Sequence, residues 1–162
     1  VREIYKHLPK KSFKVADSQV ASRWGNISDF LNFDLITPNE REARFSLADQ
    51  DSTIGELSNK LFKKTNCKNL ILKLGHRGSL CVKDNYNVNY SIPSFTNNIK
   101  DPVGAGDAYL SYATLMMLLT KNLLKSSIIG SFAAACECEI DGNIPITLTM
   151  IKDKISEFST KI

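Results

Sequence analysis

Residues 69–74, Asn-Leu-Ile-Leu-Lys-Leu, form a nearly continuous apolar run that ends at Gly75. A run of this kind is typical of a strand covered on both faces, as in a parallel sheet. Apolar runs at residues 12–16 and 33–36 predict two strands before it. The alternating residues 79–92, interrupted by a polar turn, predict a hairpin of strands 79–82 and 88–92 after it.

Between and beyond these strands, apolar residues recur at helical spacing. The expected helices cover residues 39–47, 53–64, 105–119, 123–139 and 148–158. Asn39 is expected to cap the first of them, and Asp51 or Ser52 the second. Alternating buried strands and helices predict an α/β fold, a mostly parallel sheet flanked by helices in a three-layer sandwich, with residues 1–162 as a single domain.

The composition is that of an ordinary globular protein. The chain has 162 residues, 43% apolar and 23% charged, with a formal charge of 21 − 17 = +4. The basic residues are dispersed, which argues against a nucleic-acid partner. No stretch reaches the roughly 18 apolar residues of a membrane span, and the pattern at the start of the chain predicts no signal peptide. The chain begins with Val1 rather than Met, which suggests a piece of something longer.

Four cysteines, Cys67, Cys81, Cys136 and Cys138, form no CxxC pair. Their apolar or helical surroundings favour buried thiols over a metal site or disulfides. We therefore expect a reducing, cytoplasmic location.

Residues 100–109, Lys-Asp-Pro-Val-Gly-Ala-Gly-Asp-Ala-Tyr, stand where an apolar helix begins. Gly104 and Gly106 leave backbone N–H groups unobstructed at the positive end of a helix dipole, which attracts phosphate or a developing oxyanion. Asp107 would repel a phosphate there unless a hydroxyl lay between them and lost its proton while attacking. The pattern indicates phosphoryl transfer, but spacing alone leaves a plain glycine-rich helix cap equally open.

Two other phosphate-binding motifs are excluded. The chain has no GxxxxGK[ST] run, so it lacks a Walker loop. Tyr109 stands where a dinucleotide fingerprint needs its third glycine, which makes an unrelated Rossmann-type domain a weak alternative.

Three segments resemble the ribokinase-like (PfkB) carbohydrate kinases. Residues 101–109 resemble the DTxGAGD signature, residues 37–42 (Thr-Pro-Asn-Glu-Arg-Glu) resemble TPNxxE, and residues 72–78 (Leu-Lys-Leu-Gly-His-Arg-Gly) are similar to the strand and glycine turn that contact nucleotide. They occur in the order that the family has. The resemblance implies a ribokinase-like fold and ATP-dependent phosphorylation of a sugar or sugar phosphate. It leaves ribose, fructose, nucleoside and heptose-phosphate kinases open.

The resemblance also implies a role for each residue. Asp107 would be the catalytic base, and the amides of Gly104, Ala105 and Gly106 would stabilise the transferred group. Asn39, Lys73, Gly75 and Gly78 would bind the nucleotide, although relatives often have Ser or Thr where Lys73 stands. Glu42, Asp17 and Asp101 would serve cations. The implied cofactors are ATP and Mg²⁺, with K⁺ left open at Asp101. From the residues alone, Asn39 reads as a cap and Glu42 as a solvated helix residue.

Members of the family are usually about twice as long, since length bounds domain content. The chain resembles their C-terminal, nucleotide-binding half and lacks the N-terminal half with its sugar pocket and lid. We therefore expect it to be inactive alone and to need the missing N-terminal half as a partner, in addition to nucleotide and sugar. A regulatory module that binds nucleotide without catalysis is the alternative, and the sequence leaves homo-oligomer formation open.

Overall fold

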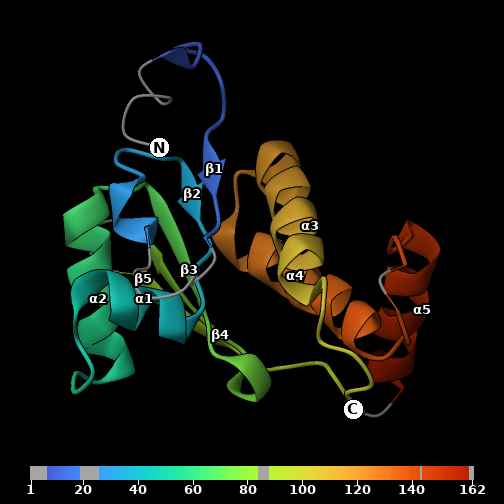
Figure 1. Cartoon of the computed structure of the whole chain (residues 1–162). Coiled ribbons are helices and arrows are strands. Elements are labelled where there is room, and N and C mark those ends of the chain that lie inside the picture. Colours follow the sequence, from blue (N-terminus) through green and yellow to red (C-terminus); the bar gives the residue numbers. More distant parts are fainter. Residues whose placement is uncertain (1–6, 19–25, 84–87, 143, 161–162) are drawn as a thin grey trace. The chain divides into compact units, whose positions relative to one another are not determined.

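The computed structural model describes residues 7–18, 26–83, 88–142 and 144–160 (Figure 1). The chain divides into two compact units, one of residues Val1–Leu74 and Leu80–Ser91 and the other of Gly75–Ser79 and Ile92–Ile162. The predicted helix tail at residues 1–8 lies mostly outside the described residues. Among the helices that are described, none is long and apolar enough to cross a membrane.

The first unit is built on a five-stranded sheet whose strands neighbour one another in chain order. They are β1 (Val15–Ala16), β2 (Leu35–Ile36), β3 (Asn69–Lys73), β4 (Ser79–Lys83) and β5 (Val88–Ile92). The β1/β2 and β2/β3 pairs are parallel. The connections between β3, β4 and β5 are too short for parallel crossovers, so these strands form antiparallel pairs. The sheet is therefore mixed, and its parallel part spans β1 to β3.

Strands β1 and β2 are shorter than the apolar runs at residues 12–16 and 33–36 predict. The reason is Asp34, whose Oδ2 accepts a hydrogen bond from the Lys14 amide at 2.8 Å. A side chain thus occupies a donor that a longer ladder would use. Burial acts against the charged form, but bonds from Lys14 and Lys68 hold the pKa of Asp34 below its ordinary value.

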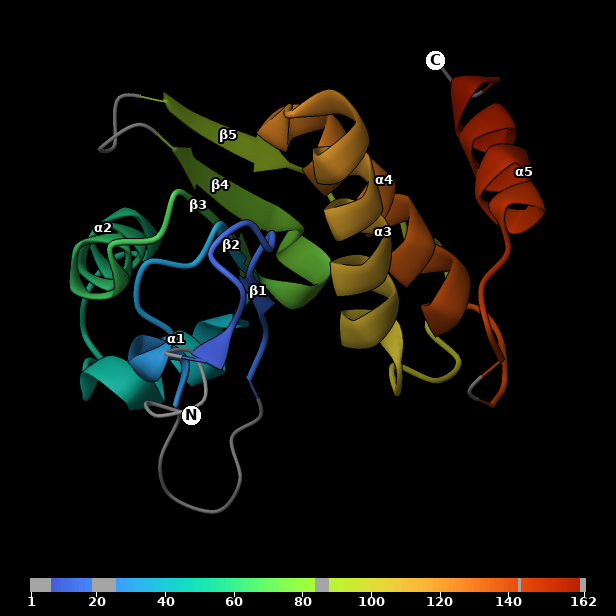
Figure 2. The same cartoon turned by 90° about the horizontal axis from the view of Figure 1, so that it is seen from above.

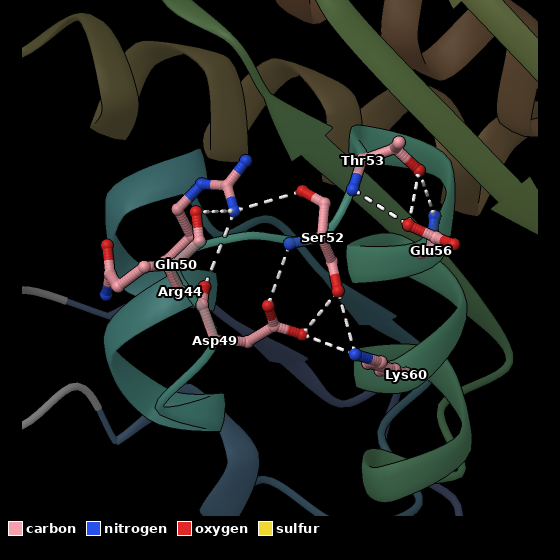
Figure 3. A network of polar contacts seen from close by, with 7 residues as sticks. All are labelled: Arg44, Asp49, Gln50, Ser52, Thr53, Glu56 and Lys60. Carbon is pink, nitrogen blue, oxygen red and sulfur yellow. Dashed lines mark hydrogen bonds and ion pairs between the residues drawn. The ribbon is translucent and has the colours of Figure 1, made fainter.

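Helices α1 (Glu40–Leu47) and α2 (Ile54–Thr65) pack against β3 and against each other. Thr53 caps α2, where Asp51 or Ser52 was expected. Its Oγ1 accepts the Glu56 amide at 3.3 Å, and Glu56 Oε2 accepts the Thr53 amide at 2.9 Å (Figure 3). This reciprocal pair satisfies two backbone donors at once, which favours Thr53 over its neighbours.

The segment between α1 and α2 is held by polar contacts (Figure 3). Arg44 Nη1 donates to the carbonyls of Gln50 and Ser52, each at 3.1 Å. Lys60 Nζ lies 2.6 Å from Asp49 Oδ2. Bonds from Lys60 and Ser52 lower the pKa of Asp49. The connection is therefore fixed by side chains from both helices.

The core of the first unit lies between the sheet and these helices. It contains Ala16, Ile27, Phe33, Ile36, Ala43, Leu57, Leu61, Phe62, Cys67, Leu70, Leu72 and Val82. Leu70, Ile71 and Leu72 are fully buried, which confirms a covered strand; it ends at Lys73, and Lys73 and Leu74 are half-buried.

The second unit contains α3 (Ala105–Thr120), α4 (Leu123–Cys138) and α5 (Leu148–Ser159) (Figure 2). Tyr109, Ala113 and Met117 line one face of α3 and are buried. A Cβ at Gly130 of α4 would lie 2.8 Å from the Tyr109 ring. Only glycine therefore allows α3 and α4 to approach this closely.

Phe95, Phe132 and Phe158 join the segment after β5 to α4 and α5. The Phe95 and Phe132 rings stack at 4.0 Å, and Phe158 meets Phe95 edge-on at 4.9 Å. Lys154 of α5 is buried, and its Nζ lies 2.7 Å from both carboxylate oxygens of Glu139.

The four cysteines are free thiols. Cys67, Cys81 and Cys136 are buried, as expected, and Cys138 is half-buried. Burial raises the pKa of Cys67 to about 11. A thiol with so high a pKa is a poor nucleophile and a poor metal ligand at neutral pH.

Candidate functional site

In the first unit, predicted site residues lie at the carboxyl ends of three neighbouring parallel strands. Asp17 directly follows β1, Asn39 lies three residues after β2, and Lys73 ends β3. Asn39 and Lys73 form a parallel bridge, and the Lys73 amide donates to the Pro38 carbonyl at 2.8 Å. Ligands of α/β proteins bind at this edge of the sheet. We name Asp17, Asn39, Glu42 and Lys73 the strand-end group.

Lys73 and Asp17 form an ion pair, with 2.5 Å between Nζ and Oδ2. Their side chains are 15% and 18% exposed. The Ser18 amide donates to Asp17 Oδ1 at 3.0 Å, so both carboxylate oxygens are engaged. Lys73, predicted to bind nucleotide, is thus tied to Asp17, a residue predicted to serve a cation. Charge-assisted bonds of this kind hold both side chains in place.

Asn39 and Glu42 form a capping box at the start of α1. Asn39 Oδ1 accepts the Glu42 amide at 2.8 Å, and Glu42 Oε2 accepts the Asn39 amide at 2.7 Å. The cap that the sequence predicted at Asn39 is therefore present. The cap uses the side-chain oxygen Oδ1 of Asn39. The side-chain nitrogen Nδ2 of Asn39 is therefore the group suited to donate to a phosphate oxygen.

Glu42 is only 4% exposed, so it is not the solvated helix residue that its position alone suggests. Burial raises its pKa above the ordinary value of 4.5, the Asn39 amide acts against this rise, and the nearby Asp17 adds to it. A cation bound beside this carboxylate would relieve the same cost, because it stabilises the charged form.

Two hydroxyl groups beside the strand-end group were not singled out from the sequence. Thr37 is fully buried, and among the described residues its Oγ1 has no hydrogen-bond partner. The Ser18 Oγ atom is also buried, and it too has no hydrogen-bond partner among the described residues. Buried hydroxyls usually have partners, so two without one at a single strand edge stand out. The signal in the sequence was a hydroxyl residue within two residues of the end of each of two strands, Ser18 after β1 and Thr37 after β2.

In the second unit, Gly75 and Gly78 form the turn predicted after β3. The Gly78 amide donates to the Gly75 carbonyl at 2.9 Å. Both residues have left-handed backbones, with φ of 61° and 85°. A Cβ at Gly78 would lie 2.0 Å from the Ile92 carbonyl oxygen, while one at Gly75 would meet nothing within 4 Å. Gly78 is therefore required for close approach, and Gly75 only for its conformation.

The helix start at residues 104–107 is open. Gly104, with φ of 86°, precedes α3, and no side chain caps the helix. The Ala105 amide reaches the Pro102 carbonyl at 3.3 Å. Within the described part of the chain, the Gly106 and Asp107 amides donate to no protein group. Asp107 lies in the first turn of α3, and its side chain is exposed. We name Gly104, Ala105, Gly106 and Asp107 the helix-start group.

Asp101 shapes the approach to this helix. Its Oδ1 accepts the Val103 amide at 2.9 Å, and its own amide points to the Cys138 carbonyl at 3.2 Å. The buried Glu137 lies close enough that Asp101 adds to the rise that burial causes in the pKa of Glu137. Asp101 is thus a turn residue here, on the chain just before the helix-start group.

A buried cluster of hydroxyl groups joins the glycine turn to α3. Tyr109 Oη lies 2.6 Å from Ser127 Oγ, and Ser79 Oγ lies 3.1 Å from each of these atoms. Ser79 follows the Gly75–Gly78 turn, and Tyr109 lies two residues after Asp107. The cluster therefore fixes two of the motifs relative to each other inside the second unit.

The predicted residues thus fall into two sets. Asp17, Asn39, Glu42 and Lys73 gather in the first unit, while the others, Gly75, Gly78, Asp101 and the helix-start group, belong to the second. Within the ranges that the structure describes, no three His, Cys, Asp or Glu residues are grouped as a metal cage. The donor set fits Mg²⁺ only as an ion that keeps most of its water, with Glu42 as the carboxylate beside it.

The chain matches a known protein family. The family model described as pfkB family carbohydrate kinase matches residues 4–148. A search of curated proteins finds no match.

Solved structures share the fold. Ribokinase from Thermotoga maritima is 24% identical, with a TM-score of 0.78, and the match covers 95% of this chain and 52% of that one. Phosphofructokinase-2 from Escherichia coli, in complex with potassium, is 18% identical with a TM-score of 0.76, over 90% and 47% of the two chains. Arabidopsis thaliana ribokinase, complexed with ribose and ATP, is 19% identical with a TM-score of 0.73, over 87% and 46%. The chain spans about half the length of these relatives.

Proposed function

Because the chain belongs to the pfkB family of carbohydrate kinases, we propose that it transfers the terminal phosphoryl group of ATP to a hydroxyl of a sugar or sugar phosphate. We propose further that it corresponds to the C-terminal, nucleotide-binding half of such a kinase. The order of its three motifs and its span of about half of the solved relatives support this assignment. The complementary half would then supply the sugar pocket.

The observation that carries the proposal is the open helix start. An exposed carboxylate stands in the first turn of a helix whose first amides are uncapped. Asp107 would accept the proton of the acceptor hydroxyl while the hydroxyl oxygen forms a bond to the γ-phosphorus of ATP. The bond from that phosphorus to the oxygen that bridges it to the β-phosphate would break, which releases ADP. The amides at the helix start would stabilise negative charge on the transferred group.

We also propose nucleotide contacts for the strand-end group. Lys73 would attract phosphate charge, and Asn39 would donate to a phosphate oxygen. Glu42 would hold hydrated Mg²⁺, which neutralises phosphate charge when bound. Potassium occurs in one of the solved relatives, and Asp101 is the residue that we propose for a monovalent cation here.

The test is Asp107→Asn, measured in the kinase with its complementary half present. Loss of a general base lowers turnover by about 10²–10⁴-fold. ADP affinity, measured by calorimetry on this chain, should stay unchanged, because the amide keeps the shape of the side chain. Asp153→Asn, an exposed acid on α5, is the matched control and should leave both quantities unchanged.

The same variant separates the catalytic proposal from a regulatory module. If Asp107→Asn retained normal turnover, Asp107 would not be the base. If the assembled protein bound ADP without phosphorylating any sugar in a panel of pentoses, hexoses and their phosphates, the regulatory reading would replace the kinase.

A further inference from the structure

Helix α3 is apolar on two opposite sides. Tyr109, Ala113 and Met117 are buried, and the first two lie beside Gly130 of α4. Leu115, Leu118 and Leu119, on the other side, are 55%, 43% and 81% exposed. A helix that is apolar all round is typical of one covered on all sides.

The exposed side of α3 is continuous with the proposed catalytic residue. Asp107, Ser111, Leu115 and Leu118 are all exposed and are spaced four, four and three residues apart. Residues at this spacing lie on one side of a helix. A polypeptide that covers the leucines therefore also reaches the turn that carries Asp107.

The side is uncharged apart from Asp107 at its start. Between Asp107 and the helix end at Thr120, α3 contains no Lys, Arg, Asp or Glu. Contiguous apolar surface of this kind marks a protein contact rather than a face that stays in water. Its occupant should therefore be an apolar polypeptide surface.

We propose that Leu115, Leu118 and Leu119 form the docking surface for the complementary half of the kinase, an inference that rests on the proposed function. The occupant follows from length, because the chain spans only 52% and 47% of two solved kinases of its fold. This contact brings the acceptor pocket of that half to Asp107. A second copy of this chain would cover the leucines without supplying an acceptor pocket.

Photo-crosslinking in the source cells tests the proposal. The amino acid p-benzoylphenylalanine replaces Leu115, and mass spectrometry identifies the peptides joined to it. A matched variant carries the same probe at Leu148, which is 65% exposed on α5. We expect Leu115, but not Leu148, to join a polypeptide with the amino-terminal half of a pfkB-type kinase, whether in the same chain or a separate one.

The identified half, once purified, allows a quantitative measurement. A charge at the centre of an apolar interface weakens binding by about 100-fold, so Leu118→Arg should do so while Leu148→Arg should not. Circular dichroism should show both variants folded, since both leucines are exposed. The proposal would be overturned if the probe at Leu115 joined only a second copy of the chain, only an unrelated protein, or nothing. It would also be overturned if the probe at Leu148 gave the same crosslink as the probe at Leu115.

The crosslink does not depend on phosphoryl transfer. Crosslinking with an inactive assembly would therefore reject the kinase function and keep the docking surface. If the assembly were active and Leu118→Arg did not weaken it, the docking surface would be rejected and the kinase function kept.

Discussion

The strand-end group and the helix-start group differ in how their charges are satisfied. In the first, Asp17 is paired with Lys73, and Glu42 is bonded to the Asn39 amide. In the second, Asp107 is exposed and α3 has no side-chain cap. The first group is thus organised before any ligand arrives, whereas the second leaves charge and donors for a reactant. Stability and chemistry should therefore separate between the two groups.

The largest expected effect is on the glycine turn of the second unit. Gly78→Ala forces a Cβ onto the Ile92 carbonyl at a left-handed backbone and should lower the free energy of unfolding by about 2–4 kcal/mol. Gly75→Ala, at a left-handed backbone with φ of 61° but with no overlap, should cost about 1 kcal/mol. Urea unfolding measures both. Equal losses would mean that the backbone at Ile92 moves to accommodate the added Cβ. The close packing at Gly78 would then not contribute to the stability of this unit.

Breaking the ion pair of the strand-end group comes next. Lys73→Met removes the lysine of the half-buried ion pair with Asp17, whose side chain is 18% exposed, and should cost about 1–3 kcal/mol of stability. The control is Lys68→Met, which breaks a 2.7 Å pair with Asp34 whose lysine is 73% exposed. That loss should stay below about 1 kcal/mol. If both variants lost the same amount, the strand-end group would not be specially organised.

Glu42→Gln should change how stability depends on pH. Because the pKa of Glu42 is raised in the folded protein, its native state binds a proton more readily than the unfolded chain. Its contribution is present below the ordinary value of 4.5 and is lost as pH rises through the folded pKa. Urea midpoints from pH 4 upward should therefore fall in the wild type and fall less in the variant. At neutral pH the difference should be smaller than the loss from Lys73→Met.

The smallest expected change in stability is that of Asp107→Asn. An exposed acid in the first turn contributes about 0.3–1 kcal/mol through the helix dipole, and the amide retains part of the hydrogen-bonding capacity. Thermal unfolding of this chain measures it. A loss larger than that of Lys73→Met would reverse the contrast between the two groups.

Local features of the site could be predicted from the sequence, and distant ones could not. The cap at Asn39 depends on residues three apart, and the start of α3 depends on Gly104 and its neighbours, so both follow from short patterns. Lys73 meets Asp17 across 56 residues, and only the strand order brings them together. The shortening of β1 depends on one carboxylate at Asp34, which no periodicity reveals.

The glycine turn has a consequence for truncation. Residues Gly75–Ser79 belong to the helical unit although the chain around them belongs to the sheet unit. A protein that began at Ile92 would lose the Ser79 hydroxyl from the side of Tyr109, and the carbonyl of Ile92 would lose the glycine packed over it. A single break in the polypeptide therefore cannot separate the two units without removing residues from one of them. We expect that the two units must be expressed as one chain.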